Sequence, residues 1–358
     1  MKEVGILAND GTIKIGTELD KSGLESGMSG LGSFAQKGFS VVSTAAKAAT
    51  AAIGAGLVAS VKVGASFEAE MSKVQAISGV TGDELAQLTE KAKEMGAKTK
   101  FSASESAQAF EYMAMAGWKT DDMLNSIGGI MNLAAASGED LASVSDIVTD
   151  AMTAMGLAAD GTTTIVKDGY TKEVSNASHF ADVLAAASSN SNTNVAMMGE
   201  TFKYAAPLAG ALGYSVEDLA QAIGLMANSG IKGSNAGTAL RSVLTRLAKP
   251  PKEAAEAMEQ YGISIKNSDG SMKSLVEVME NMRDPLQGLP EDEQAAAAAA
   301  IGGQEAMSGL LAIVNASESD FKKLSAAIDN ADGSAEQMAD IMQNNLSGQL
   351  TVMKSAAE

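Results

Sequence analysis

The chain has 358 residues, and 46% of them are hydrophobic, which is enough for one large folded unit or several smaller ones. It has no cysteine and a single histidine, His179, so disulfides, thiolate metal sites and most histidine-based hydrolytic sites are excluded. The formal net charge is −18, and residues 68–358 carry 20 basic and 39 acidic side chains. Because acidic surfaces repel phosphates, we expect no sequence-specific binding of nucleic acid.

Residues 1–33 are predicted to form a short strand pair followed by a flexible connector. Apolar and polar residues alternate on either side of the Asn9-Asp10-Gly11 turn, which predicts strands at Val4–Ala8 and Thr12–Glu18. Residues 22–33 are rich in Ser and Gly, which is typical of a connector.

Residues 34–67 are predicted to form an apolar helix with one face of small residues, spaced every fourth position. Such a face lets two helix backbones approach closely. The uncharged window between Lys47 and Lys62 is 14 residues, whereas a bilayer span needs about 20. Two interpretations stay open for residues 41–64: packing against neighbours or other copies, and insertion into a membrane. The residues of this helix-packing face are Ala48, Ala52, Gly56, Ser60 and Gly64.

Residues 68–315 have the pattern of successive helices joined by loops that share one sequence pattern. In the two longer loops, Gly117 and Gly213 are followed by a hydroxyl residue, two acids and an apolar residue. Each Gly is expected to end a helix in the left-handed conformation, and Thr120 and Ser215 are expected to cap the next helix. Shorter versions follow Gly82 and Gly138, and the acids suit the positive end of a helix dipole.

Two segments that contain these loops, 99–148 and 193–243, match at an offset of 94 to 96. Phe101 aligns with Val195, and Asp122 aligns with Asp218. The match predicts an internal duplication of helical hairpins, with repeated patterning of helix caps as the alternative explanation.

Two β-hairpins are predicted between helices. Thr162–Val174 and Ile263–Lys273 each contain an Asp-Gly turn, at 168–169 and at 269–270. The expected fold is therefore mainly α, a multi-helix array of short helical hairpins with small β-hairpin insertions.

The last part of the chain is predicted to be helical. Pro290 and three acids begin a helix that Gly302-Gly303 should end. Residues 316–358 are predicted to form amphipathic helices, the start of a longer helical region, because no Gly or Pro follows the final apolar positions. One stripe at spacings of three or four consists of Met342, Leu346, Leu350, Met353 and Ala357.

The Gly-rich segment 230–241 invites interpretation as a phosphate-binding loop. Gly237 is followed by Thr238 and Ala239 rather than by Lys and Ser or Thr, and no apolar strand precedes the segment. We therefore predict a turn between helices, with Ser234 as a cap. His179 has Ser178 and Asp182 nearby, but close neighbours on one helix make a poor triad. No catalytic, cofactor-binding or metal-binding residue is predicted.

The same segment resembles the signature of the core region of bacteriophage tail tape measure proteins. Its matching positions are Gly230, Lys232, Gly233, Gly237, Thr238 and Arg241, followed by Leu244 and Arg246. Further resemblances occur in order between about residues 60 and 315, and the hairpin at 162–174 is a local insertion. These are at Ala65–Met71, Phe101–Glu105, Tyr112–Trp118, Leu212–Leu219, Tyr261–Ile263 and Ile301–Gly303.

The resemblance implies a structural component of a phage or prophage tail that sets tail length during assembly and takes part in genome delivery. It implies several associating copies in the tail interior, contacts with tail tube and tail-tip or baseplate proteins, and assembly chaperones in the host cytoplasm. A wholly helical chain of this length would span about 540 Å. Because the middle is rich in loops, we expect a folded domain here, with the ruler beyond residue 358.

Two other functions remain as alternatives. One is a membrane-active protein that inserts residues 41–64 to form a DNA passage, with transient contact with the host membrane. The other is an enzyme acting on cell walls, which a chain with one histidine and no cysteine disfavours.

Overall fold

The computed structural model describes residues 64–167 and 170–356. The chain divides into two units, Met1–Val61 and Lys62–Glu358, and the described residues belong to the second. The strand pair, the connector and most of the predicted helix at 34–67 lie outside these residues, as do four of the five small residues of its packing face. The fifth, Gly64, lies in a helix at 64–78 and is exposed, with no described atom within 4 Å of where its Cβ would be.

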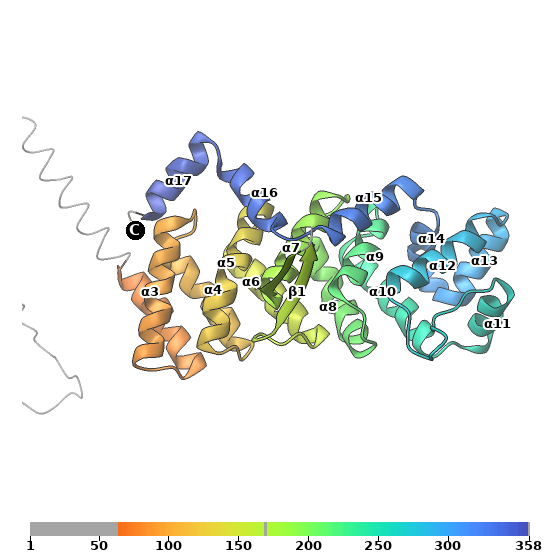
Figure 1. Cartoon of the computed structure of the whole chain (residues 1–358), viewed down its shortest axis with the longest axis horizontal. Helices are drawn as coiled ribbons and strands as arrows, with labels where there is room; N and C mark the ends of the chain where they lie inside the picture. Colours follow the sequence, from red (N-terminus) through yellow and green to blue (C-terminus); the bar gives the residue numbers. More distant parts are fainter. Residues whose placement is uncertain (1–63, 168–169, 357–358) are drawn as a thin grey trace, which may run out of the picture. The chain divides into compact units, whose positions relative to one another are not determined.

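The described part of the chain is mainly α-helical and contains a small β-hairpin, which confirms the predicted fold class (Figure 1). After the helix at 64–78 the elements are α3 (Asp83–Lys98), α4 (Ala103–Met115), α5 (Thr120–Ser137), α6 (Leu141–Met155), β1 (Thr162–Lys167), β2 (Tyr170–Ser175), α7 (Asn176–Ser189), α8 (Val195–Ala211), α9 (Val216–Asn228), α10 (Gly233–Ala248), α11 (Lys252–Gln260), α12 (Leu275–Gln287), α13 (Glu291–Gly302), η1 (Gln304–Ala306), α14 (Met307–Val314), α15 (Glu318–Asp329), α16 (Ser334–Gln343) and α17 (Leu346–Ala356).

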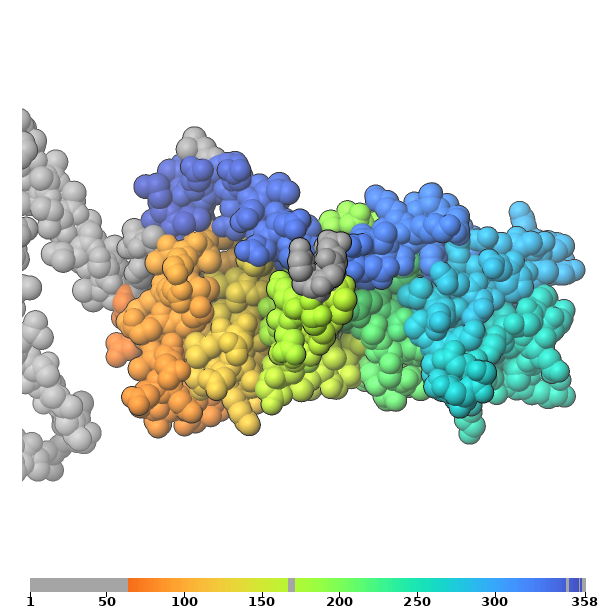
Figure 2. Space-filling model, in the orientation of Figure 1, coloured from red at the N-terminus to blue at the C-terminus, as the bar shows by residue number. Residues whose placement is uncertain are grey.

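Helices near in sequence pack against one another from α3 to α14, and the last three helices then return along them. α4 packs on α3 and α6, α8 packs on α6 and α10, and α13 packs on α10 and α11. On the way back, α15 contacts α9 and α7, α16 contacts α5 and α7, and α17 contacts α3. Figures 1 and 2 show this return as the dark blue helices beside the orange and green ones. The C-terminal segment therefore covers the helices that began the unit.

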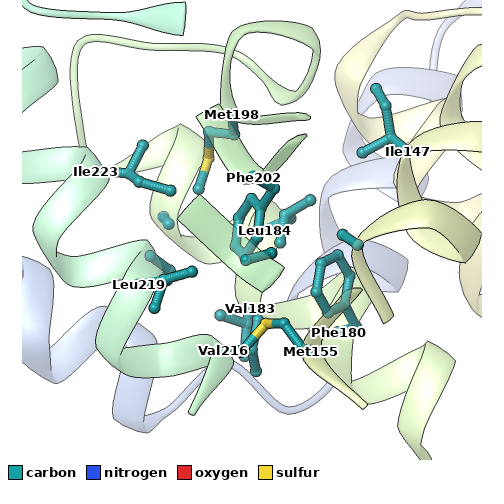
Figure 3. Close-up of a cluster of buried hydrophobic side chains, with 14 of the residues drawn as sticks. Ile147, Met155, Phe180, Val183, Leu184, Met198, Phe202, Val216, Leu219 and Ile223 are labelled. Carbon is teal, nitrogen blue, oxygen red and sulfur yellow. The ribbon is translucent and has the colours of Figure 1, made fainter. Parts of the chain in front are cut away.

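The centre of the core is a cluster from α6, α7, α8 and α9 (Figure 3). Phe180 and Phe202 lie at its centre, with ring centroids 5.3 Å apart and planes tilted by 58°. Only 4% of the chain is aromatic, so aliphatic and Met side chains fill the space around the two rings. The labelled members are Ile147, Met155, Val183, Leu184, Met198, Val216, Leu219 and Ile223.

The left-handed conformation predicted for the loop glycines is confirmed, but one of the two predicted helix caps is wrong. Gly117 and Gly213 have φ of 80° and 79°, the left-handed region that favours Gly. Ser215 caps α9, because its Oγ accepts from Asp218 N at 3.1 Å. The prediction for Thr120 is wrong: it is the first residue of α5 and its side chain is buried. The backbone N–H of Lys119 is bound by the Asp122 carboxylate instead, at 2.9 Å.

The two segments of the predicted duplication each overlap three successive helices and end within the third. α4, α5 and α6 form the first set, and α8, α9 and α10 form the second. Asp122 and Asp218 occupy the same position in the second helix of each set, and each accepts from the backbone N–H just before that helix. A common origin stays a prediction.

One predicted hairpin is confirmed, and the other is reduced to a single bridge. β1 and β2 pair antiparallel from Thr162↔Ser175 to Lys167↔Tyr170. The predicted turn residues 168–169 lie outside the described residues. In the segment 263–273 the only bridge is Lys266↔Met272. There the Asp269 carboxylate accepts from Ser271 N at 2.9 Å, and such local side-chain acceptors compete with a longer ladder.

At the C-terminal end, α13 begins after Pro290 and ends at Gly302, as predicted, and Gly303 has a φ of 93°. The stripe predicted from Met342 onward is divided, because α16 ends at Gln343 and α17 begins at Leu346. Ala357 and the side chain of Leu346 lie outside the described set. Met342, Leu350 and Met353 are 53%, 56% and 68% exposed.

Within the described residues, no single helix has the length and apolar composition to cross a membrane. One pair, Glu291–Gly302 with Gln304–Val314, meets those criteria jointly but is bent by 117°. Ile301, Leu310 and Ile313 of this pair are at most 2% exposed, and Met307 and Leu311 are half-buried against the core, so these helices form part of it.

Two equivalent aspartates give a matched test of helix capping. Asp218 accepts from Ser215 N at 3.1 Å and from Val276 N at the start of α12 at 3.0 Å, whereas Asp122 accepts from Lys119 N alone. We expect Asp218→Ala to lower the free energy of unfolding by about 2–3 kcal/mol and Asp122→Ala by about 1 kcal/mol. Urea denaturation of both variants measures the difference. Equal losses would show that the bond to α12 contributes nothing.

Candidate functional site

The segment 230–241, which carries the family resemblance, joins α9 to α10. Gly230 has a φ of 86° after the end of α9, and Gly233, with a φ of 58°, begins α10. The half-buried Lys232 occupies the N-cap position. A helix precedes the segment, so the strand that a phosphate-binding loop needs is not there. The prediction of Ser234 as the cap is wrong, because α10 has already begun at Gly233 and Ser234 is exposed within its first turn.

Gly237 allows α10 to lie directly against α8. A Cβ at this position would be 2.8 Å from Thr201 O and 2.8 Å from Tyr204 Cβ, closer than real Cβ contacts. Thr201 also donates its Oγ1–H to Gly233 O at 3.0 Å. The glycines of the segment therefore serve a turn and a helix contact.

The other face of the segment is open to solvent. Thr238 and Arg241 are exposed, and the Arg241 guanidinium lies 5.9 Å from the ring centroid of Tyr204. This distance allows a cation–π interaction with a ring that is itself 37% exposed. Of the six predicted positions, Gly237 makes the buried contact with α8, and Thr238 and Arg241 form an exposed polar face. Gly230, Lys232 and Gly233 form the turn and the start of α10.

Farther along α10, two side chains bind the C-terminal end of α13. Ser242 Oγ donates to Gly302 O at 2.9 Å, and Arg246 donates to Ala300 O at 2.7 Å and to Ile301 O at 3.0 Å. Three successive carbonyls that a helix end leaves unpaired are thereby satisfied, and the Arg charge suits the negative end of the dipole. The sequence signalled Arg246 only through the family resemblance and gave no signal for Ser242.

His179 is held by a carboxylate and is not part of a triad. Its Nε2 lies 2.5 Å from Glu217 Oε1, and its buried Nδ1 has no hydrogen-bond partner among the described residues. The Asp182 carboxylate accepts instead from Gly333 N and Ala335 N, both at 2.9 Å, at the start of α16. Ser178 Oγ is bonded to Ser175 Oγ. None of these groups is placed to activate a nucleophile.

An acidic cleft of about 710 Å³ lies between α5, the β-hairpin, α7 and α16. Asp121, Asp332 and Glu336 line it with Lys172, which pairs with Asp332 at 3.1 Å. Burial raises the pKa of Asp182 at its wall, although the bonds from Ala335 N and Gly333 N act in the opposite direction. Across the described ranges, no three His, Cys, Asp or Glu residues are grouped to hold a metal ion.

The comparison with protein families decides the assignment. The sequence model of the phage-related minor tail proteins matches residues 89–303, which is more than half of the chain and includes the whole of α10. This chain belongs to that family.

One similar phage protein is named a tape measure protein, and two others are named probable tape measure proteins. The chain is 39% identical to the tape measure protein of Pneumococcus phage Dp-1 over 84% of this chain and 25% of the relative. It is 30% identical to the probable tape measure protein of Escherichia phage P2 over 85% of this chain and 36% of the relative. It is 27% identical to the probable tape measure protein of Clostridium phage phiCD119, over 68% of this chain and 25% of the relative. The chain thus spans about a quarter to a third of these relatives, and no solved structure matches it.

The contact at Gly237 predicts a specific loss of stability. We expect Gly237→Ala to lower the free energy of unfolding by about 1–3 kcal/mol, because the added methyl meets the α8 backbone. Gly128→Ala in α5 is the matched control, since a Cβ there meets no atom within 4 Å and Ala favours a helix by about 1 kcal/mol. Thermal and urea unfolding measure both. A Gly237→Ala variant as stable as the control contradicts the close contact.

The His179–Glu217 pair predicts a pH dependence. Burial raises the pKa of Glu217, but the hydrogen bond from His179 and backbone bonds together hold it below its ordinary value of 4.5. A lowered folded-state pKa adds stability above the unfolded value, and this is lost as the pH falls below about 4.5. We expect Glu217→Gln to cost about 1 kcal/mol at pH 7 and progressively less below pH 4.5. Urea unfolding between pH 7 and pH 3 measures this, and a cost independent of pH contradicts the assignment.

Proposed function

We propose that this chain is the folded core of a tail tape measure protein, a structural component of a phage tail that takes part in setting tail length and in genome delivery. The observation that carries the proposal is the similarity to two tape measure proteins over 84% and 85% of the chain. In this proposal the chain acts through structure rather than catalysis, because Gly237, Ser242 and Arg246 of α10 serve helix packing and helix capping.

The helices of this unit support a role in anchoring rather than in measuring. The longest helix that is described in full, α5, has 18 residues and so spans about 27 Å. A tail is measured by a part of the protein whose length grows with residue number, and helices folded back on one another do not provide this. The relatives extend well beyond the matched region, and we place the ruler in such an additional part.

The partners follow from the same proposal. A minor tail protein acts together with other tail components, and for this chain we propose tail tube proteins and tail-tip or baseplate proteins. Assembly chaperones would bind it in the host cytoplasm before it enters the tail interior, where several copies associate. The exposed face of Thr238 and Arg241 is one surface available for such contacts.

Membrane insertion of residues 41–64 stays a prediction, since all of them except Gly64 lie outside the described residues. Liposome flotation of the whole chain tests it. Retention of the entire protein in the aqueous fraction contradicts it.

Tail length distinguishes an anchor from a ruler. Leu244 is fully buried in α10, and we expect phage with Leu244→Asp to make no tails, because an unpaired charge in the core unfolds the unit. We expect in-frame deletions in the proposed ruler to shorten tails by about 1.5 Å per residue. Electron microscopy of lysates measures both effects.

The neighbouring exposed position supplies the control, since Thr245→Asp on the same helix should leave tails of normal length. In-frame deletions within residues 83–356 that still give tails, shortened by about 1.5 Å per residue, would overturn the anchoring role. If no deletion in the gene changes tail length or assembly, the tape measure function itself is wrong.

A further inference from the structure

The corner between α16 and α17 is closed by one asparagine. Asn345 donates its Nδ2–H to Met342 O at 2.7 Å, at the end of α16, and its Oδ1 accepts from Gly348 N at 2.9 Å, in the first turn of α17. Its backbone N–H bonds Gln343 O at 2.8 Å. Figure 1 shows the two helices meeting at this corner, from which α17 runs toward α3. The bend is therefore a bonded structure rather than a frayed helix end.

The bend also requires a glycine at position 348. A Cβ there would lie 2.8 Å from Gln343 Cα and 2.9 Å from Gln343 C, and still closer to Gln343 O. These are backbone atoms, which cannot rotate away as the end of a side chain can. In a continuous helix, residues five apart in sequence do not face each other, so the same Cβ would be accommodated. Position 348 thus distinguishes a bent from a straight segment.

Among the α17 side chains that the structure describes, no large apolar one is buried, and Val352 is half-buried. Ser355 Oγ bonds Gly96 O at 2.9 Å and also approaches Phe101 O, but its single proton serves one acceptor at a time. Leu350 and Met353 of α17 are more than half exposed. By contrast, α15 is fixed by Phe321, Leu324 and Ile328, each at most 3% exposed. The return segment is therefore held firmly at α15 and weakly at α17.

The sequence, in turn, has the pattern of one uninterrupted amphipathic helix across the corner. In a straight helix the apolar positions 342, 346, 350 and 353 would fall within an arc of about 80°. The bend separates Met342 from Leu350 and Met353 and leaves all three exposed.

We propose that residues 334–356 are a two-state segment, bent and docked on α3 or straight as a single helix, and that Gly348 and Asn345 permit the bent state. Straightening assembles a continuous apolar stripe and uncovers the carbonyl of Gly96 on α3 and that of Phe101 in the loop between α3 and α4. The bend thus controls whether that stripe exists. The proposal concerns this unit alone and does not depend on a role in tail length.

A distance measurement between two spin labels tests the proposal directly. The chain has no cysteine, so Ala97→Cys on an exposed site of α3 and Met353→Cys on α17 give a unique pair of label sites. In the straight state, position 353 lies about 15 Å beyond Gln343 along the axis of α16. In the labelled whole chain we expect mainly the short distance. Adding Gly348→Ala should raise the ratio of long to short distances at least about fivefold, because the added Cβ meets the Gln343 backbone in the bent state alone.

Two further variants make the result decisive. Gly128→Ala is the same change at an open helical site and should leave the distances unchanged. Asn345→Ala removes both side-chain bonds of the corner without adding an atom at position 348, and it should also favour the long distance. The helix content measured by circular dichroism should stay the same or rise in the two variants of the corner, Gly348→Ala and Asn345→Ala. An unchanged distance distribution in Gly348→Ala, or a broad distribution with lost helix content in both corner variants, overturns the proposal.

Discussion

α10 lies against α8 at a separation that any side chain at position 237 would prevent. This contact fixes one side of α10 to the central cluster around Phe180 and Phe202, which α8 helps to form (Figure 3). On its other side, Ser242 and Arg246 hold the C-terminal end of α13. α10 therefore links the central helices to those that follow. A chain with so few aromatic side chains can build such a link because small residues bring backbones close.

Buried carboxylates join parts of the unit that are far apart in sequence. Asp182 in α7 binds the first backbone N–H groups of α16, 151 and 153 residues away, and Asp218 in α9 binds the start of α12. Burial raises the pKa of both groups, which shows that desolvation opposes their ionisation. The bonded N–H groups offset part of that cost, because each lies at a helix start where the dipole favours negative charge. Helix capping here is a tertiary interaction as well as a local one.

Local signals in the sequence were sufficient to predict the helices, the glycines at which helices end and the first hairpin. Gly117, Gly213 and Gly303 indicated where helices end, because positive φ is a property of one residue. The errors at Thr120 and Ser234 have a common cause: each helix begins at or one residue before the hydroxyl, a shift that composition does not show. The partners of Asp182, Ser242 and Arg246 depend on three-dimensional neighbours, so no spacing could reveal them. The division of the C-terminal stripe depends likewise on a backbone contact between Gln343 and Gly348.

A ruler that converts residue number into length at about 1.5 Å per residue measures only if one end is held in place. The described unit does not convert residue number into length, because its helices fold back on one another. Asp182 accepts from Ala335 N at 2.9 Å across 153 residues, a stretch that as one continuous helix would extend about 230 Å. Residues added inside such a unit enlarge loops or helices without separating its ends in proportion. If the proposed function is correct, the tertiary contacts that make the fold keep this unit out of the measured length, which is what the fixed point of a ruler requires.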